Sequence, residues 1–161
     1  MKTLLIICFI PGIAFSQFLE PDSITGIYTQ KEVITVDSLK KETMYSMALQ
    51  WIALNYKSST DVVKLSDPTA GKIVIKANFP TSLFMKDGWI RHTLVLEFKD
   101  GKFRYTFSNY SYYSPGSGEI AFEDPIAMKK RVVEDAQTSG LRAMISLEDY
   151  LKTAKETTDD W

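Results

Sequence analysis

Cysteine and histidine are almost absent from this chain of 161 residues, which has one of each, Cys8 and His92. Cys8 lies inside an apolar N-terminal run that we expect to be removed, so the mature chain would have no thiol. That excludes disulfides, thiol nucleophiles and thiolate metal sites. Any metal site would then depend on carboxylates, and these show no recognisable ligand spacing. The sequence therefore predicts no metal and no cofactor.

A strong charge of one sign and a long hydrophobic run are lacking as well. The formal net charge is −1, which gives no electrostatic footprint for nucleic acid. The apolar run at 4–15 is too short to span a bilayer, and it follows Lys2. Ala14 and Ser16 supply small residues at the −3 and −1 positions of a signal-peptidase site. We therefore predict a signal peptide at 1–16 and an exported protein, periplasmic or extracellular, without stable membrane insertion after cleavage. An uncleaved anchor or a buried first strand is the alternative.

Alternation and helical spacing divide the rest of the chain into segments. These patterns predict, in chain order, a flexible leader at 17–23, a strand at 24–36, a helix at 40–56, strands at 72–79, 89–99 and 102–113, a helix at 126–155 and a polar tail at 156–161. The fold class that follows is α+β, in the order β-α-β-β-β-α, with both helices packed on one face of an antiparallel sheet. One domain at 24–155 has enough residues for one core.

Turn and cap residues set the expected boundaries. Asp37 and Ser38 are candidate caps for the first helix. Pro80 ends the second strand, and Met85–Trp89 forms the next turn. Gly140 either breaks the last helix or lets it cross the sheet closely, and the sequence leaves both open.

The clearest pattern surrounds Asp100-Gly101, which lies between two alternating apolar runs. An Asp-Gly pair in that setting predicts a type I′ hairpin turn, in which both residues have positive φ. The turn fixes the register, which on one face pairs Phe98 with Phe103, Leu96 with Tyr105, Leu94 with Phe107, and His92 with Asn109. The other face pairs Glu97 with Arg104, Val95 with Thr106, Thr93 with Ser108, Arg91 with Tyr110, and Trp89 with Tyr112. We expect the first face to pack on the helices and the second to face water.

The segments "YSMALQWIALNYKSSTDVVKLSDPTAGKIVIKANF" and "GWIRHTLVLEFKDGKFRYTFSNY" together resemble a known family, the domain of unknown function 4468. The resemblance covers about 26–113 and rests on the order and spacing of the motifs. It implies a fold like that of the TATA-binding protein, in exported proteins mostly of Bacteroidota, and it implies no activity. A DNA-binding surface of that kind needs cations and apolar wedges, and here Arg91 and Arg104 are balanced by Glu97. We therefore predict no nucleic-acid partner.

Aromatic residues gather on the expected open face. Trp89, Arg91, Tyr110, Tyr112 and Tyr113 would form an amphipathic patch of the residue types that dominate binding hot spots. The plainer interpretation is a cross-strand aromatic ladder that stiffens the sheet, or a patch covered by the loop that follows. These five residues are the predicted binding site.

His92 is the natural candidate for acid–base chemistry, because its ordinary pKa lies near neutrality. Its expected neighbour, Asn109, can only hydrogen-bond, so we interpret His92 as a polar residue at the edge of the core. The segment 114–118 lacks both the nucleophile-turn and the phosphate-loop spacing. The sequence therefore predicts no catalytic residue, and a hydrolase that uses His92 is the third functional hypothesis.

Two other hypotheses stand before it. The first is an exported, non-enzymatic binding domain that uses the open sheet face and the loop at 109–122; its partner would be a peptide, a glycan or an envelope protein. The second is a carrier of a small apolar ligand, held in a cavity between the sheet and the last helix. Such a cavity would be lined by Phe103, Phe107, Met144 and Leu151.

Overall fold

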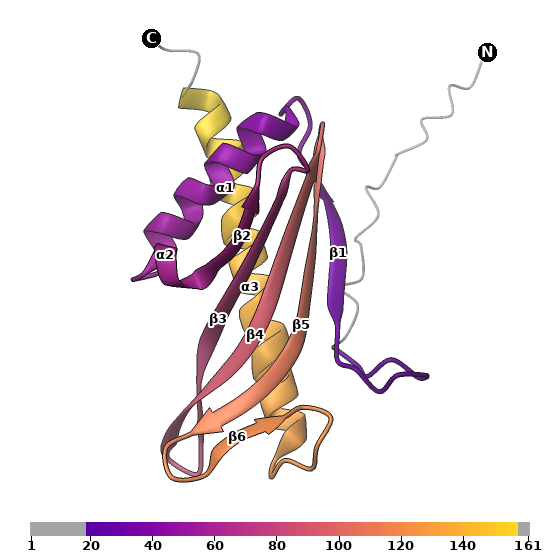
Figure 1. Cartoon of the computed structure of the whole chain (residues 1–161), viewed down its shortest axis with the longest axis vertical. Helices are drawn as coiled ribbons and strands as arrows, with labels where there is room; N and C mark the ends of the chain where they lie inside the picture. Colours follow the sequence, from indigo (N-terminus) through magenta and orange to yellow (C-terminus); the bar gives the residue numbers. More distant parts are fainter. Residues whose placement is uncertain (1–18, 158–161) are drawn as a thin grey trace, which may run out of the picture.

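The computed structural model describes residues 19–157, and within them the chain forms one antiparallel sheet with helices against it (Figure 1). The elements are β1 (Gln30–Thr35), α1 (Lys41–Asn55), α2 (Ser59–Val62), β2 (Val63–Asp67), β3 (Lys72–Leu83), β4 (Lys86–Lys99), β5 (Lys102–Ser114), β6 (Gly118–Ala121) and α3 (Lys129–Thr157). The strand order is β1-β5-β4-β3-β2, with β6 paired to the far end of β5. The predicted signal peptide and the end of the tail lie outside the described residues.

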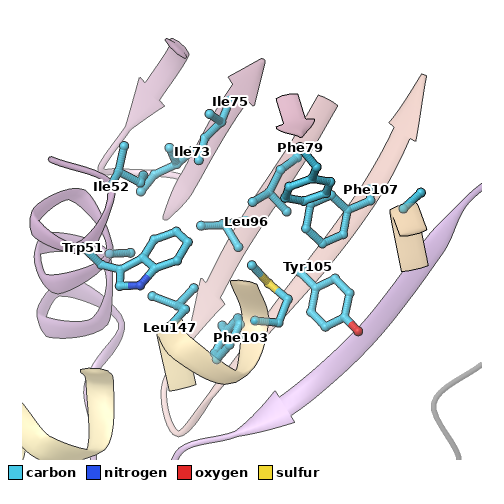
Figure 2. Packing of buried hydrophobic residues seen from close by; sticks show 14 of the residues in the cluster. Trp51, Ile52, Ile73, Ile75, Phe79, Leu96, Phe103, Tyr105, Phe107 and Leu147 are labelled. Atoms are coloured by element: carbon cyan, nitrogen blue, oxygen red, sulfur yellow. The ribbon is translucent and has the colours of Figure 1, made fainter. Parts of the chain in front are cut away.

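The core lies between one face of the sheet and the helices α1 and α3. Figure 2 shows Trp51 of α1 and Leu147 of α3 pointing toward Leu96 and Phe103 of the sheet. All four side chains are at most 3% exposed. Because alternate residues of β4 and β5 enter this layer, each strand has one buried face, and burial of these apolar side chains is the main stabilising contribution. The predicted fold class, α+β with helices on one face, is therefore confirmed.

Gly140 does not break α3, which runs continuously through it. A Cβ atom at this position would lie 2.9 Å from Oε1 of Gln30 and 3.4 Å from the ring of Phe107. The missing side chain lets α3 cross the sheet closely, which is the second of the two predicted alternatives.

The predicted caps of α1 are wrong. The helix begins after Lys40, which makes no side-chain cap, and the backbone N–H of Lys41 donates instead to Oδ1 of Asp100 at 2.9 Å. A carboxylate from the β4–β5 turn therefore sits at the positive end of α1. That turn also differs from the prediction, since φ is positive at Gly101 but not at Asp100. The reason is tertiary, because the chain between β1 and α1 hydrogen-bonds to Gly101 on both its N–H and its carbonyl.

The predicted boundaries of β3 are also wrong. The strand continues through Pro80 to Leu83, and the chain reverses at Phe84 and Met85, both with positive φ. These two side chains are 70% and 102% exposed, so a type I′-like turn here is made by bulky residues that rarely adopt this conformation. The sequence patterns also missed the short elements α2, β2 and β6.

The described part of the predicted leader, residues 19–23, contacts the domain at Leu19 and Pro21. Leu19 is buried and its N–H donates to Oε1 of Gln137 on α3 at 3.3 Å. Pro21 forms an isolated bridge with Tyr28. Leu19 is therefore packed on the domain, whereas Glu20 and Pro21 are exposed. Within 19–157, no helix has the length and apolarity needed to cross a membrane.

Candidate functional site

The β4–β5 hairpin departs from its predicted register at Asn109. Phe98, Leu96 and Leu94 pair as predicted, and so do the intervening residues on the other face. Beyond Thr93 the ladder shifts, so that two residues of β5 oppose His92 on β4. Asn109 has a φ of 53°, the left-handed conformation that Asn tolerates better than most residues. It is the extra residue of a β-bulge.

The bulge moves part of the predicted site into the core. Tyr110 and Tyr112 are 1% and 7% exposed, so their predicted place on the open face is wrong. Tyr110 stacks on Phe122 with ring centroids 5.2 Å apart, and Tyr112 lies over Gly88. One inserted residue exchanges the two faces of a strand, which is why both tyrosines turned inward.

The remaining three predicted residues form a corner on the open face. Trp89 now pairs with Tyr113, and their ring centroids are 5.9 Å apart. The guanidinium of Arg91 lies 4.5 Å from the centre of the Tyr113 ring and donates to Oε2 of Glu119 at 2.5 Å. Glu119 also accepts a hydrogen bond from Ser111, so β6 is held against this corner. The sequence patterns had included Glu119 only as part of the predicted loop at 109–122.

A second feature of this region is an unpaired strand edge. β2 pairs with β3 only from Lys72 to Ile75, whereas β3 runs on to Leu83. Figure 1 shows β2 beside one end of β3, with the rest of that strand at the margin of the sheet. In the described part of the chain, residues 76–83 therefore have a strand neighbour on one side only. Unpaired edges are the usual docking places for extended peptides.

A cleft of about 1260 Å³ surrounds this edge. On the helix side its wall is formed by Trp51, Asn55, Tyr56, Lys57, Ser58, Val62, Ala77, Phe79, His92, Arg142, Ala143 and Ser146. On the open face it is formed by Lys76, Asn78, Pro80, Trp89, Arg91, Thr93, Asn109, Ser111 and Glu119. The volume exceeds that of most small-molecule pockets, which suits an elongated ligand.

The charges that line the cleft are mostly positive. Lys57, Lys76 and Arg142 are exposed, and no carboxylate within residues 19–157 forms an ion pair with them. Glu119 is the one acid among the lining residues, and it is already paired with Arg91. The cleft therefore favours an anionic ligand.

His92 lies at the bottom of the helix side of the cleft. Its ring stacks on Phe79 with centroids 4.1 Å apart, and its Nδ1 atom lies 3.4 Å from the carbonyl oxygen of Ile90. The Nε2 atom is buried without a hydrogen-bond partner in the described structure. Burial lowers the pKa of His92 from 6.5 to about 4, although the hydrogen bond to Ile90 acts in the opposite direction. The imidazole is therefore neutral at pH 7, and the predicted pairing with Asn109 is replaced by the bulge.

Other groups that could support chemistry are few in the described structure. Residues 19–157 hold no cluster of three or more His, Cys, Asp or Glu side chains that could bind a metal ion. The side chain of Asn109 donates to Oγ1 of Thr93 at 3.3 Å and takes no part in orienting His92. The arrangement offers hydrogen-bonding groups, cations and aromatic surfaces, which are the means of binding a ligand.

The sequence profile of a family described as a domain of unknown function (DUF4468) with TBP-like fold matches residues 31–113, more than half of the chain. The chain belongs to this family. The match runs from β1 to the far end of β5, so it includes the free edge of β3 and the corner formed by Trp89 and Arg91.

Solved structures agree on the fold of this DUF4468 domain. A TBP-like protein from Parabacteroides distasonis superimposes with a TM-score of 0.69 at 12% identity, over 82% of this chain and 97% of the other. A DUF4468 family protein from Bacteroides ovatus gives 0.54 at 10% identity, over 83% and 87%. At such identities the likeness shows the fold alone. A comparison with curated proteins yields no match.

The cavity expected for an apolar carrier is not the cleft of the DUF4468 domain. Phe103, Phe107, Met144 and Leu151 are each at most 1% exposed, and none of them lines the cleft. Phe107 lies directly under the close approach of α3 at Gly140. The carrier hypothesis stays a prediction.

The sequence held a signal for the bulge that we did not use. Five of the six aromatic residues of β5 fall at 103, 105 and 107 and then at 110 and 112, so the alternation changes phase between Phe107 and Tyr110. The matching apolar positions of β4 keep one phase from Ile90 to Phe98. A phase change in one strand only, with an Asn at the break, is typical of an inserted residue. The free edge of β3 had no such signal, because it depends on where β2 stops.

Proposed function

We propose that this protein is an exported, non-enzymatic binding domain whose ligand occupies the cleft along the free edge of β3. The observation that carries the proposal is the cleft itself, about 1260 Å³, which opens on an unpaired strand edge. Three of its cations, Lys57, Lys76 and Arg142, form no ion pair within residues 19–157. Two residues of the predicted site, Trp89 and Arg91, line it on the open face. Location in the periplasm or outside the cell rests on the expected signal peptide.

The chemistry of the walls favours a particular kind of ligand. Aromatic surfaces from Trp51, Tyr56 and Trp89 supply contact area, and the indole N–H of Trp51 is already satisfied by Ser146 at 3.1 Å. Lys57, Lys76 and Arg142 supply positive charge around the rim. The proposed ligand is therefore anionic and carries apolar groups, a description that fits an acidic peptide, an acidic glycan or a segment of an envelope protein.

The proposal is tested by mapping binding on ¹⁵N-labelled protein of residues 17–161. Three probes are titrated separately: a blocked hexapeptide of alternating Asp and Val, trigalacturonate, and decanoate. At least one anionic probe is expected to shift the amide signals of Ala77 and Asn78 and the indole signal of Trp89. The proposal would be contradicted by shifts confined to β1, at the opposite edge of the sheet, or by no shifts with any probe.

Charge reversal provides the matched control. Lys76→Glu combined with Arg142→Glu removes two cations of the cleft and should weaken binding at least tenfold. Lys31→Glu combined with Lys102→Glu reverses two exposed lysines of β1 and β5 that do not line the cleft, and it should leave the affinity unchanged. Equal affinity of the two double variants would show that the ligand is not held in the cleft.

A further inference from the structure

From the cleft and the edge together we infer the class of ligand and its binding mode: an extended acidic peptide of a partner protein adds as a strand beside Lys76–Asn78 of β3. This inference rests on the proposed function and deepens it. The bound peptide would continue the line of β2, which stops at the partner of Ile75. It would therefore extend the sheet at the place where the chain itself leaves the strand unpaired.

Pro80 determines which backbone groups of the edge are available. β3 and β4 stay in register through Pro80 and its partner Trp89, although proline has no N–H to donate. Proline within a sheet turns its nitrogen away from the paired strand. Because N–H and carbonyl groups alternate between the two sides of a strand, Lys76 and Asn78 share the outward direction of Pro80.

The edge therefore has a defined length for pairing. Lys76 and Asn78 each present an N–H and a carbonyl to the cleft, whereas Pro80 presents a carbonyl alone. Proline on an edge strand is a common way to limit pairing. The paired part of the peptide is expected to end beside Pro80, so that residues 81–83 play no part in it.

The two walls of the cleft determine the side chains of the peptide. Successive side chains of an added strand point to opposite faces of the sheet. On the open face they meet the ammonium group of Lys76, which has no ion pair within residues 19–157 and favours Asp or Glu. On the helix side they enter the space near Trp51 and Phe79, which favours an apolar residue. The expected peptide alternates acidic and apolar residues.

His92 gives an independent indication that the helix side receives a ligand. Its Nε2 atom is buried and has no partner among the described residues, although buried polar atoms are nearly always hydrogen-bonded. Only Ala77, its cross-strand neighbour, separates it from the edge, and the side chain of Ala77 is small. A polar residue at one helix-side position of the peptide, in place of an apolar one, would pass over Ala77 and satisfy this nitrogen.

The inference is tested with the blocked Asp-Val hexapeptide labelled with fluorescein, and with two N-methylated versions of it. Methyl groups are placed on the amides of alternate residues, in one phase or in the other. Strand addition requires the amides of one phase to pair with β3, so one methylated peptide should bind at least tenfold more weakly and the other nearly as tightly as the parent. Equal binding of both would overturn the inference.

The protein side of the same test uses proline. Asn78→Pro removes one outward N–H and should weaken the peptide at least tenfold, with the fold retained as it is at Pro80. Ser82→Pro has the same direction but lies beyond Pro80, so it should leave the affinity unchanged. If Asn78→Pro unfolds the protein, its N–H faces β4, and the inferred direction of the edge is wrong.

The outcomes separate the inference from the function it deepens. Trigalacturonate bound in the cleft without any peptide binding would leave the proposed function standing and overturn strand addition. A peptide that binds there with no dependence on N-methylation would do the same. No probe bound in the cleft would overturn both.

Discussion

The two halves of the β4–β5 hairpin are built from the same residue types and follow different rules. In the half next to the turn, Phe98, Leu96 and Leu94 pair as the alternation of the sequence predicts. In the far half, Trp89 pairs with Tyr113 instead of Tyr112, and the buried and open faces of β5 have changed places. The turn fixes register only as far as the first inserted residue.

The difference shows over which residues a hairpin turn predicts the strand register correctly. The near half is held by the turn and by its contacts with α1, including the hydrogen bond from Lys41 to Asp100. The far half is held by Tyr110 against Phe122 and by Glu119 against Arg91, which are contacts with β6 and the chain that follows it. The near half therefore keeps the register that the turn sets, whereas the shifted far half is held by β6 and the chain that follows it.

The largest expected effect comes from replacing, one at a time, two tyrosines of the far half with alanine. Tyr110→Ala removes a fully buried ring and should lower the free energy of unfolding by about 3–5 kcal/mol. Tyr113→Ala removes a half-buried ring and should cost about 1 kcal/mol. Urea unfolding of the two variants measures both. A regular ladder without the bulge would bury Tyr113 and expose Tyr110, so Tyr113→Ala would then cost more than Tyr110→Ala. That result would show that β5 has no bulge.

The pH dependence of stability tests the environment of His92, which lies opposite the bulge where the two halves of the hairpin meet. Its pKa falls from 6.5 to about 4 on folding, so between these values the unfolded chain binds a proton that the native protein does not. His92 therefore has no effect on the pH dependence of stability above about pH 6.5. As the pH falls from there to about 4, its protonation in the unfolded chain lowers the free energy of unfolding by about 3 kcal/mol. Urea unfolding at pH 7 and pH 4 measures the loss, which His92→Phe should largely remove. An equal loss in both proteins would mean that His92 is protonated in the native state.

Substitution of Gly88 should have a smaller effect on stability, and it tests where the ring of Tyr112 lies in the far half. A Cβ atom here would lie 2.7 Å from the ring of Tyr112, so Gly88→Ala should cost about 1–3 kcal/mol, the usual penalty of overpacking. The same change combined with Tyr112→Leu should cost less than the two single changes together, because the ring that Ala meets has gone. Thermal unfolding of all four proteins gives the coupling. Additive effects would place the ring of Tyr112 away from Gly88.

The smallest expected effect concerns the bulge residue itself. Asn109 adopts a left-handed conformation in which Ala is strained, so Asn109→Ala should cost about 1 kcal/mol, while Asn109→Gly should be neutral or slightly stabilising. Chemical denaturation distinguishes the two variants. Ser108→Ala and Ser108→Gly serve as the control, since Ser108 lies in regular strand and the order of the two effects should reverse there.

The parts of the fold that the sequence predicted correctly are those with local signals of their own. Trp51 and Ile52 lie on a stripe of helical spacing, and the helix they predicted is α1. The alternation from Ile73 to Phe79 predicted β3 up to Pro80, but Pro80 is no barrier on an edge strand, where its missing N–H faces outward. The elements that were missed, α2, β2 and β6, are too short to show a period.

The candidate site was predicted in part for the same reason. The open face holds Trp89, Arg91 and Tyr113. Tyr110 and Tyr112 are buried on the other face, because the register of β5 shifts at Asn109, between these tyrosines and the turn. Glu119 was included only as part of the predicted loop at 109–122, and Arg142 was not indicated, since these residues reach the cleft from β6 and α3. Their role depends on distances that no spacing in the sequence specifies.

The sequence by itself determined the fold class, the two long helices and the register of the near half of the hairpin. Local hydrogen bonding and the alternation of apolar residues are sufficient for these, because they act between residues close in the chain. Tertiary structure alone decided where β2 stops along β3, how α3 crosses the sheet and which charges surround the free edge. These features depend on packing between segments far apart in the chain, and the cleft exists because that packing leaves one strand edge uncovered.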